Sequence, residues 1–270
     1  MIIRTEQMKA LERVSELAFE VRTYAHLHKW FPRHCEIVGE DQMHEVIRFG
    51  LKKANGHDLT AECCVRSYIE FMCLLGSGFD SDTLLAWAAV ILSARSNTDQ
   101  VKRGALLYAK VWDYFDHLKV DMQDGARLLD AWQQLGFVGN EILTPAAMPK
   151  FIESLHGRLQ RMFPAKCTYV GDQSVKFAIN SSVQDAAAYG INFERGAMLF
   201  SGMRFVLGES FHEDPLLPWV SATLRDPAVA DPQKKVDRLY EEGTSFLMRW
   251  SKLASAGKGP AAEGSKDGQR

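Results

Sequence analysis

The chain has 270 residues, of which 46% are hydrophobic and 24% are charged, so it can bury a core and is not a disordered protein. Its length favours two domains over one. The net charge of -2 gives no electrostatic field that attracts nucleic acid. No hydrophobic run approaches the length of a membrane span. We therefore expect the chain to bind neither nucleic acid nor a membrane.

A first helix is expected up to Trp30, because apolar side chains recur on one face of this stretch at Phe19, Leu27 and Trp30. It should end at Phe31-Pro32, since the residue before a proline disfavours the helical conformation.

Four further helices are expected in the first 120 residues. One covers about 40–54, and the next begins after an N-cap at Thr60 and stops at Gly76. A short helix around Trp87 follows a cap at Asp82, and a last helix covers about 99–118.

The chain then repeats itself at an offset of 132 residues, over which Phe31-Pro32, Gly76, Asp82 and Trp87 recur as Phe163-Pro164, Gly208, Asp214 and Trp219. These residue types fix turns and cores, so their recurrence indicates a duplicated domain. Upstream the register changes, because Met148 corresponds to Met8. The first helix of the second copy should therefore be about two turns shorter.

No stretch alternates enough to require a sheet, and the best strand candidate, 166–170, is short. The sequence predicts an all-α protein of two tandem, internally duplicated helical domains, at 1–120 and 143–253. A connector covers 121–142 and is partly helical at 126–135, and a flexible tail covers 254–270.

The first residues lead into a polar helical pattern without the hydrophobic centre of a signal peptide. The five cysteines are odd in number and form no C-x-x-C motif, which favours reduced thiols. We therefore expect a cytoplasmic protein.

One candidate metal site is a histidine-rich group, and the repeat provides a control for it, because a site needed in both copies should recur. Zinc could bind a set formed by His26, His28, His34 and Cys35. The second copy replaces all three histidines, and His26 and His28 point about 200° apart on a helix. Histidines without a metal are the favoured interpretation.

The second candidate is an acidic loop, Asp80-Ser81-Asp82, which the second copy matches with His212-Glu213-Asp214. Paired carboxylates could bind a divalent cation or act as acid and base. Only the third acid recurs, and a capping role explains it better. With no nucleophile-elbow, nucleotide-binding or zinc-protease motif, we assign no catalytic residue, cofactor or metal, and an enzyme is a minority hypothesis.

The recurring aromatic residues Phe31, Phe163, Trp87 and Trp219 are expected to hold the cores. The copies differ most in basic residues, so they present different surfaces on one frame. Six basic positions of the first copy are candidate partner-binding residues: Arg33, His34, Arg48, Lys52, Lys53 and Arg66. The alternative is that these solvent-exposed residues diverged after the duplication without any role in binding.

Several segments resemble a poorly characterised bacterial helical family. They are Met1 to Met8, His26 to Pro32, Tyr189 to Arg195, Leu207-Gly208, and Asp214 to Trp219. The family's members are accessory proteins encoded beside the spike, PAAR and effector genes of type VI secretion clusters. The first copy departs from the family pattern at Thr83 and Ala86, where the second copy has prolines.

The resemblance implies a cytoplasmic bacterial protein that binds a secreted effector, a toxin or a spike component. We expect a non-enzymatic adaptor or chaperone, because two related domains with different surfaces suit bridging. The alternative is an immunity protein that neutralises a cognate toxin by blocking its active site.

Overall fold

The computed structural model describes residues 5–93, 99–122, 125–136 and 139–256. Within these residues the chain forms thirteen α-helices and a short 3-10 helix, and β-type pairing is limited to one isolated bridge between Ile142 and Phe193. The all-α prediction is therefore confirmed, and 166–170 is helical rather than extended. Among the helices described, none combines the length and hydropathy needed to cross a membrane.

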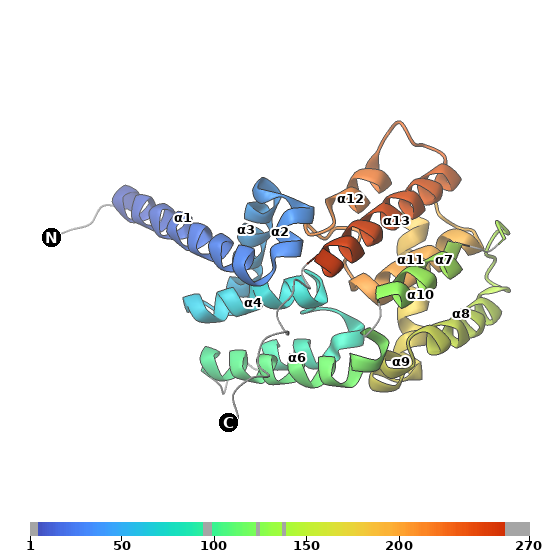
Figure 1. Cartoon of the computed structure of the whole chain (residues 1–270), viewed down its shortest axis with the longest axis horizontal. Coiled ribbons are helices and arrows are strands. Elements are labelled where there is room, and N and C mark those ends of the chain that lie inside the picture. Colours follow the sequence, from blue (N-terminus) through green and yellow to red (C-terminus); the bar gives the residue numbers. More distant parts are fainter. Residues whose placement is uncertain (1–4, 94–98, 123–124, 137–138, 257–270) are drawn as a thin grey trace, which may run out of the picture.

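Two sets of helices lie side by side (Figure 1), and one connecting helix joins them along the chain. The first half contains α1 (Thr5–Trp30), α2 (Pro32–Val38), α3 (Glu40–Gly56), α4 (Glu62–Leu75), the 3-10 helix η1 (Thr83–Leu85), α5 (Ala86–Ser93) and α6 (Gln100–Met122). The connecting helix is α7 (Gly125–Gly136). The second half contains α8 (Met148–Met162), α9 (Pro164–Val170), α10 (Asp172–Ala188), α11 (Glu194–Leu207), α12 (Pro218–Arg225) and α13 (Pro232–Ala256).

The bounds of the helices repeat at the offset seen in the sequence. Helices α9, α10, α11 and α12 begin and end 132 positions after α2, α3, α4 and α5. The corners also match, because φ is -125° at Phe31 and -133° at Phe163, and +87° at Gly39 and +83° at Gly171. These matched corners support the predicted duplication.

The first helices of the two halves differ in length more than predicted. Helix α1 has 26 residues and α8 has 15, so α1 extends about three turns further rather than two. Helix α8 carries a proline in its first turn, Pro149, which is a favoured position for a helix start. The extra turns of α1 therefore have no counterpart in the second half.

Two local expectations were wrong or incomplete. Helices α4 and α11 begin at Glu62 and Glu194 without a side-chain cap. Thr60, which the sequence predicted to be the N-cap of α4, therefore does not cap this helix. The side chain of Gln100 instead accepts hydrogen bonds from the backbone N–H groups of Thr60 and Ala61, at 2.7 and 2.8 Å. The helices α2 and α9 were not expected, because seven residues are too few to show a hydrophobic period.

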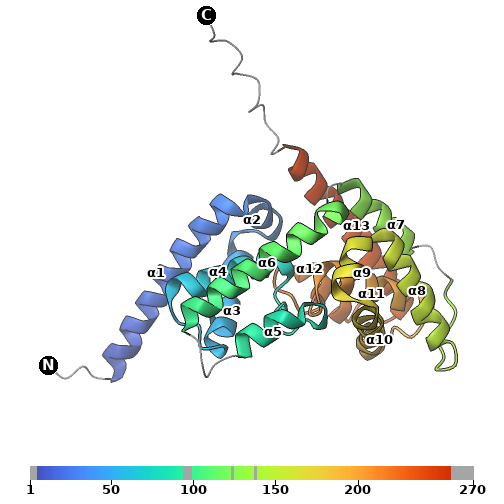
Figure 2. The ribbon, with the colours of Figure 1, turned by 90° about the horizontal axis from the view of Figure 1, so that it is seen from below.

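The two halves share a core, so the predicted domains at 1–120 and 143–253 are not separately packed units. The larger hydrophobic cluster contains Leu27 and Phe71 of the first half together with Leu199 and Leu224 of the second. The last helix of each half also contacts the short corner helix of the other, α6 against α9 and α13 against α2 (Figure 2). Each half therefore completes the packing of its partner.

The predicted connector is part of the second half's core. Helix α7 packs against α11 and α13, and the ring of Trp132 stacks on Tyr240 with centroids 5.8 Å apart. A Cβ atom on Gly202 would lie 2.2 Å from Leu135 Cδ1, and one on Gly243 would lie 2.1 Å from the Trp132 ring, so both glycines are needed for this close approach. The predicted tail begins inside α13, and 257–270 lies outside the described residues.

The halves come closest at Gly76 and Gly208, the predicted helix stops. Both have positive φ, +94° and +99°. A Cβ atom on Gly76 would lie 2.5 Å from Leu207 O, and one on Gly208 would lie 3.0 Å from Leu75 O. Glycine is therefore required here both by the backbone conformation and by the opposing half.

A pair of alanine substitutions separates these two requirements. Gly39 has nearly the same backbone angles as Gly76, yet a Cβ atom there would meet nothing within 4 Å. Gly39→Ala should lose about 1–3 kcal/mol of unfolding free energy through backbone strain alone. Gly76→Ala should lose roughly a further 1–3 kcal/mol through the clash with Leu207 O. Urea unfolding of both variants tests this, and equal losses would contradict the close crossing.

Candidate protein-binding site

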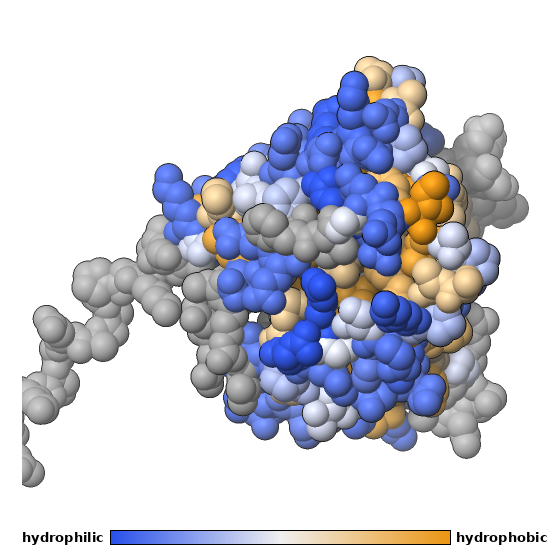
Figure 3. Space-filling model, turned by 90° about the vertical axis from the view of Figure 1, so that its right-hand side faces the viewer, coloured by the Kyte–Doolittle hydropathy of each residue, from blue (hydrophilic) through white to orange (hydrophobic). Residues whose placement is uncertain are grey.

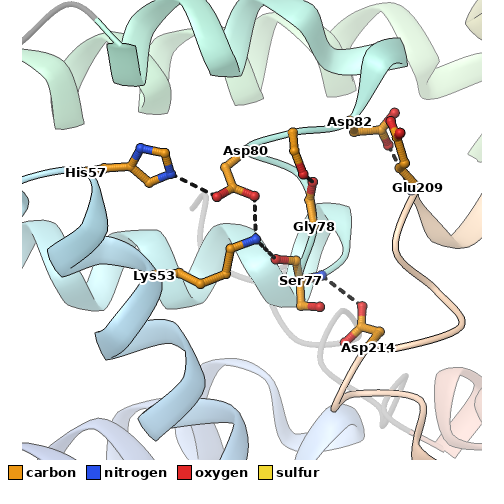
Figure 4. Close-up of polar contacts among 9 residues, drawn as sticks. Lys53, His57, Ser77, Gly78, Asp80, Asp82, Glu209 and Asp214 are labelled. Atoms are coloured by element: carbon orange, nitrogen blue, oxygen red, sulfur yellow. Dashed lines mark hydrogen bonds and ion pairs between the residues drawn. The ribbon is translucent and has the colours of Figure 1, made fainter. Parts of the chain in front are cut away.

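The loops 76–82 and 208–214 exchange hydrogen bonds where the halves cross (Figure 4). Asp214 Oδ2 accepts from Ser77 N at 2.8 Å, and the equivalent Asp82 Oδ2 accepts from Glu209 N at 3.2 Å. The other oxygen of each carboxylate caps its own chain, at 2.8 Å from Leu84 N and from Leu216 N. These two aspartates therefore join the halves in addition to the capping expected from the sequence.

Burial raises the pKa of both Asp82 and Asp214, although their backbone N–H donors act in the opposite direction. Both carboxylates are almost fully buried, so the backbone N–H groups replace the water that a free carboxylate would bind. Paired with backbone from both halves, the two aspartates have a structural role that accounts for their recurrence.

Asp80, the first acid of the same loop, lies in a polar cluster of the first half. Lys53 Nζ donates to Asp80 Oδ1 at 2.6 Å, and His57 Nε2 lies 2.8 Å from Asp80 Oδ2 (Figure 4). Burial alone would raise the pKa of Asp80, but hydrogen bonds from His57 and Lys53 and the charge of Lys53 outweigh it and hold this pKa at about 2. The carboxylate is therefore ionised and fully engaged inside the molecule.

The second half has a buried polar cluster of its own. Arg204, only 1% exposed, pairs with Asp185 at 2.8 Å and with Glu209 at 2.5 Å. Asp185 stands at the position equivalent to Lys53, whereas Arg204 stands where the first half has Met72, so the two clusters are built at different positions. Buried charges need such partners, and the two halves meet the need with different residues.

The six basic candidates from the sequence do not form one patch. Lys53 is held by Asp80 and by Ser77 O, and Arg66 lies 3.9 Å from Glu62 on α4. The half-exposed Arg33 lies on α2 with His34, whereas the other four candidates lie on α3 and α4. The structure brings together only Arg48 and Lys52, which line a groove of about 570 Å³ between α1 and α3. Arg48 is already paired with Glu20 and Glu45, which leaves Lys52 as the groove's remaining candidate for pairing with a partner.

His34 faces a different space, a cavity of about 210 Å³ between α2, α4 and the end of α13. Its ring packs edge-on against Trp250, with centroids 4.7 Å apart. Burial lowers the pKa of His34 to about 4, so the ring is neutral at physiological pH. It is therefore not a cationic recognition residue.

The proposed histidine and cysteine group does not come together. His26 Nε2 lies 2.6 Å from Glu70, His34 lies at the cavity, and Cys35 is buried. Among the described residues, no group of three or more His, Cys, Asp or Glu side chains could hold a metal ion.

Exposed hydrophobic side chains are distributed unequally between the halves, a feature that the sequence analysis missed. Of the sixteen large ones found exposed in the described residues, thirteen lie in the first half. The other three are Ile142, which precedes α8, Phe177 and Met248. The end of the molecule formed by the second half is mainly hydrophilic, with a hydrophobic area at one side (Figure 3).

Two helices carry most of this exposed surface. The exposed hydrophobic residues of α1 are Met8, Leu11, Val14, Leu17, Val21 and Trp30, and those of α6 are Val101, Leu106, Tyr108 and Trp112. The signal was present in the sequence, because each helix has more hydrophobic positions than one buried face can use. Which of two faces stays exposed, however, depends on the packing of other helices.

Comparison with known proteins adds no assignment, because no family model, no curated protein and no solved structure matches this chain. The binding surfaces of the first half are therefore assessed on their own chemistry.

The pKa of Asp80 predicts a specific dependence of stability on pH. Because the pKa in the folded state, about 2, lies below the ordinary value of 3.8, the stabilisation is fully present above about pH 4 and is lost as the pH falls through 2. Asp80→Asn should cost roughly 2 kcal/mol of unfolding free energy at pH 6 and almost nothing near pH 2. Denaturant unfolding from pH 2 to 6 measures this, with the exposed Asp116→Asn as a control of small effect.

Proposed function

We propose that this chain is a non-enzymatic accessory protein that binds another protein, as an adaptor or chaperone for an effector or spike component of a type VI secretion system in the bacterial cytoplasm. The observation that carries the binding role is the concentration of exposed hydrophobic side chains in the first half. Exposed apolar patches that are rimmed by polar residues are typical of protein-binding surfaces. The link to secretion comes from the family resemblance of the sequence alone.

The extended part of α1 is the strongest single surface. It leaves the body of the molecule (Figure 1), and the first buried side chain described along it is Phe19. Leu11, Val14, Leu17 and Val21 follow one another at intervals of three and four residues, so they share one side of the helix. Burying such a side chain stabilises a complex by about 1.5–3 kcal/mol, so covering the stripe favours association.

Charged side chains border this stripe. Arg13 and Glu16 on α1 face Arg48 and Lys52 on α3 across the groove. A hydrophobic stripe beside a charged groove has the composition of an interface core and its polar rim. The rim contains both signs of charge, which suits a specific protein partner better than a polyanion.

The different surfaces of the two halves favour an adaptor. The first half offers the exposed hydrophobic residues, whereas the second half uses the same frame to pack α7 and offers a mainly hydrophilic end (Figure 3). One half can therefore bind a partner while the other remains free. An immunity protein also binds protein, so the experiment must separate the two roles.

Val14→Glu tests the α1 surface, because Val14 is 64% exposed and the substitution should leave the fold intact. Co-purification with the effector encoded beside the gene should fall at least tenfold, since a carboxylate would be buried at the interface. Phe177→Glu on α10, where Phe177 is 56% exposed, is the matched control and should bind normally. Equal binding by both variants would contradict this surface.

The same complex distinguishes the adaptor from the immunity protein. An adaptor should bind an effector fragment that lacks the toxic domain, and should not protect cells from the toxin. Protection of cells, with binding confined to the toxic domain, would replace the adaptor role with the immunity role.

A further inference from the structure

Helix α7 shows what one face of the repeated frame can bind. In the second half this helix packs against α11 and α13, with Leu135 over Gly202 and the Trp132 ring over Gly243. Trp132 Nε1 also donates to Thr244 Oγ1 at 3.0 Å. The frame repeats at 132 positions, so α4 and α6 present the equivalent face in the first half.

On α6 this face is exposed and aromatic. Tyr108 and Trp112 stand at the positions of Tyr240 and Thr244, and they are 53% and 57% exposed. Their rings contact each other edge to face, with centroids 5.9 Å apart. Val101 lies on the same side of the helix and is also exposed. These three residues therefore face water, whereas Val111, at the position of Gly243, is buried.

The same comparison holds on α4. In the second half Met198, Leu199 and Gly202 are buried, and Gly202 lies against Leu135 of α7. Their counterparts Arg66, Ser67 and Glu70 are only partly buried, and Leu74 is 41% exposed. In the first half α1 contacts α4, and His26 of α1 lies 2.6 Å from Glu70, but no described helix packs against both α4 and α6 as α7 packs against both α11 and α13. We call the surface formed by Arg66, Ser67, Glu70, Leu74, Tyr108 and Trp112 the α4–α6 face.

We propose that the α4–α6 face binds an amphipathic helix of a partner protein, in the way that α11 and α13 bind α7. The internal precedent defines the chemistry of this helix. A large apolar residue equivalent to Trp132 packs on Tyr108 and Trp112, and small residues beside it allow close approach, as Ala131 does in α7.

One difference between the faces defines the charge of the bound helix. Glu70 stands where Gly202 lies under Leu135, and its carboxylate lies 2.6 Å from His26 Nε2. A leucine at that place of the bound helix would desolvate the carboxylate, whereas a lysine would pair with it. The partner helix therefore carries an apolar residue and, three positions later, a basic one.

A peptide that copies 125–136 with Leu135→Lys is the probe. Titrated with the full chain, the fluorescein-labelled peptide should bind saturably, and its Trp132→Ala version should bind at least tenfold more weakly. Trp112→Glu and Tyr108→Glu in the protein should each weaken binding at least tenfold. Phe177→Glu, at matched exposure, should leave it unchanged.

Several outcomes would overturn the proposal. Saturable binding could be absent, or the wild type and Trp112→Glu could bind equally. Binding could also be lost on Tyr240→Glu instead, which would mean that the peptide displaces α7. Concentration-dependent self-association of the wild type that Trp112→Glu abolishes would assign the face to a second copy and also contradict it. The test needs no effector, so it can fail or succeed independently of the α1 surface.

Discussion

The close crossing of the two halves at Gly76 and Gly208 is the constraint on which the rest of the structure depends. The backbones approach so closely there that neither glycine can carry a side chain. The crossing also places Asp82 and Asp214 within reach of backbone N–H groups of the opposite half. A buried carboxylate without these donors would be costly, so neither loop is satisfied in an isolated half. The shared core follows from this crossing.

Much of the frame was predictable from the sequence because it is fixed locally. The proline after Phe31 and after Phe163 ends one helix and begins another, and Asp82 caps the turn two residues away. The exchange of hydrogen bonds across the halves was not predictable, because it depends on how two loops 132 residues apart meet in space. For the same reason Lys53 was taken for a recognition residue, whereas it is paired with Asp80 inside the fold.

The two halves show how one frame can serve two purposes. In the second half, Gly202 and Gly243 admit α7, and Arg204 completes a buried ion-pair cluster. In the first half, Glu70 and Val111 stand at the glycine positions, and the aromatic residues beside them remain exposed. The second half thus stabilises itself with its own connecting helix. The first half leaves part of the equivalent surface exposed.

Hydrogen exchange of backbone amides, measured for the chain alone and in complex with its proposed protein partner, tests the central claim most directly. The account predicts that binding slows exchange in the first half, on α1, α4 and α6, while α8 and α10 are unchanged. Slowed exchange confined to α8 and α10, with the first half unaffected, would contradict the claim that the first half is the binding half.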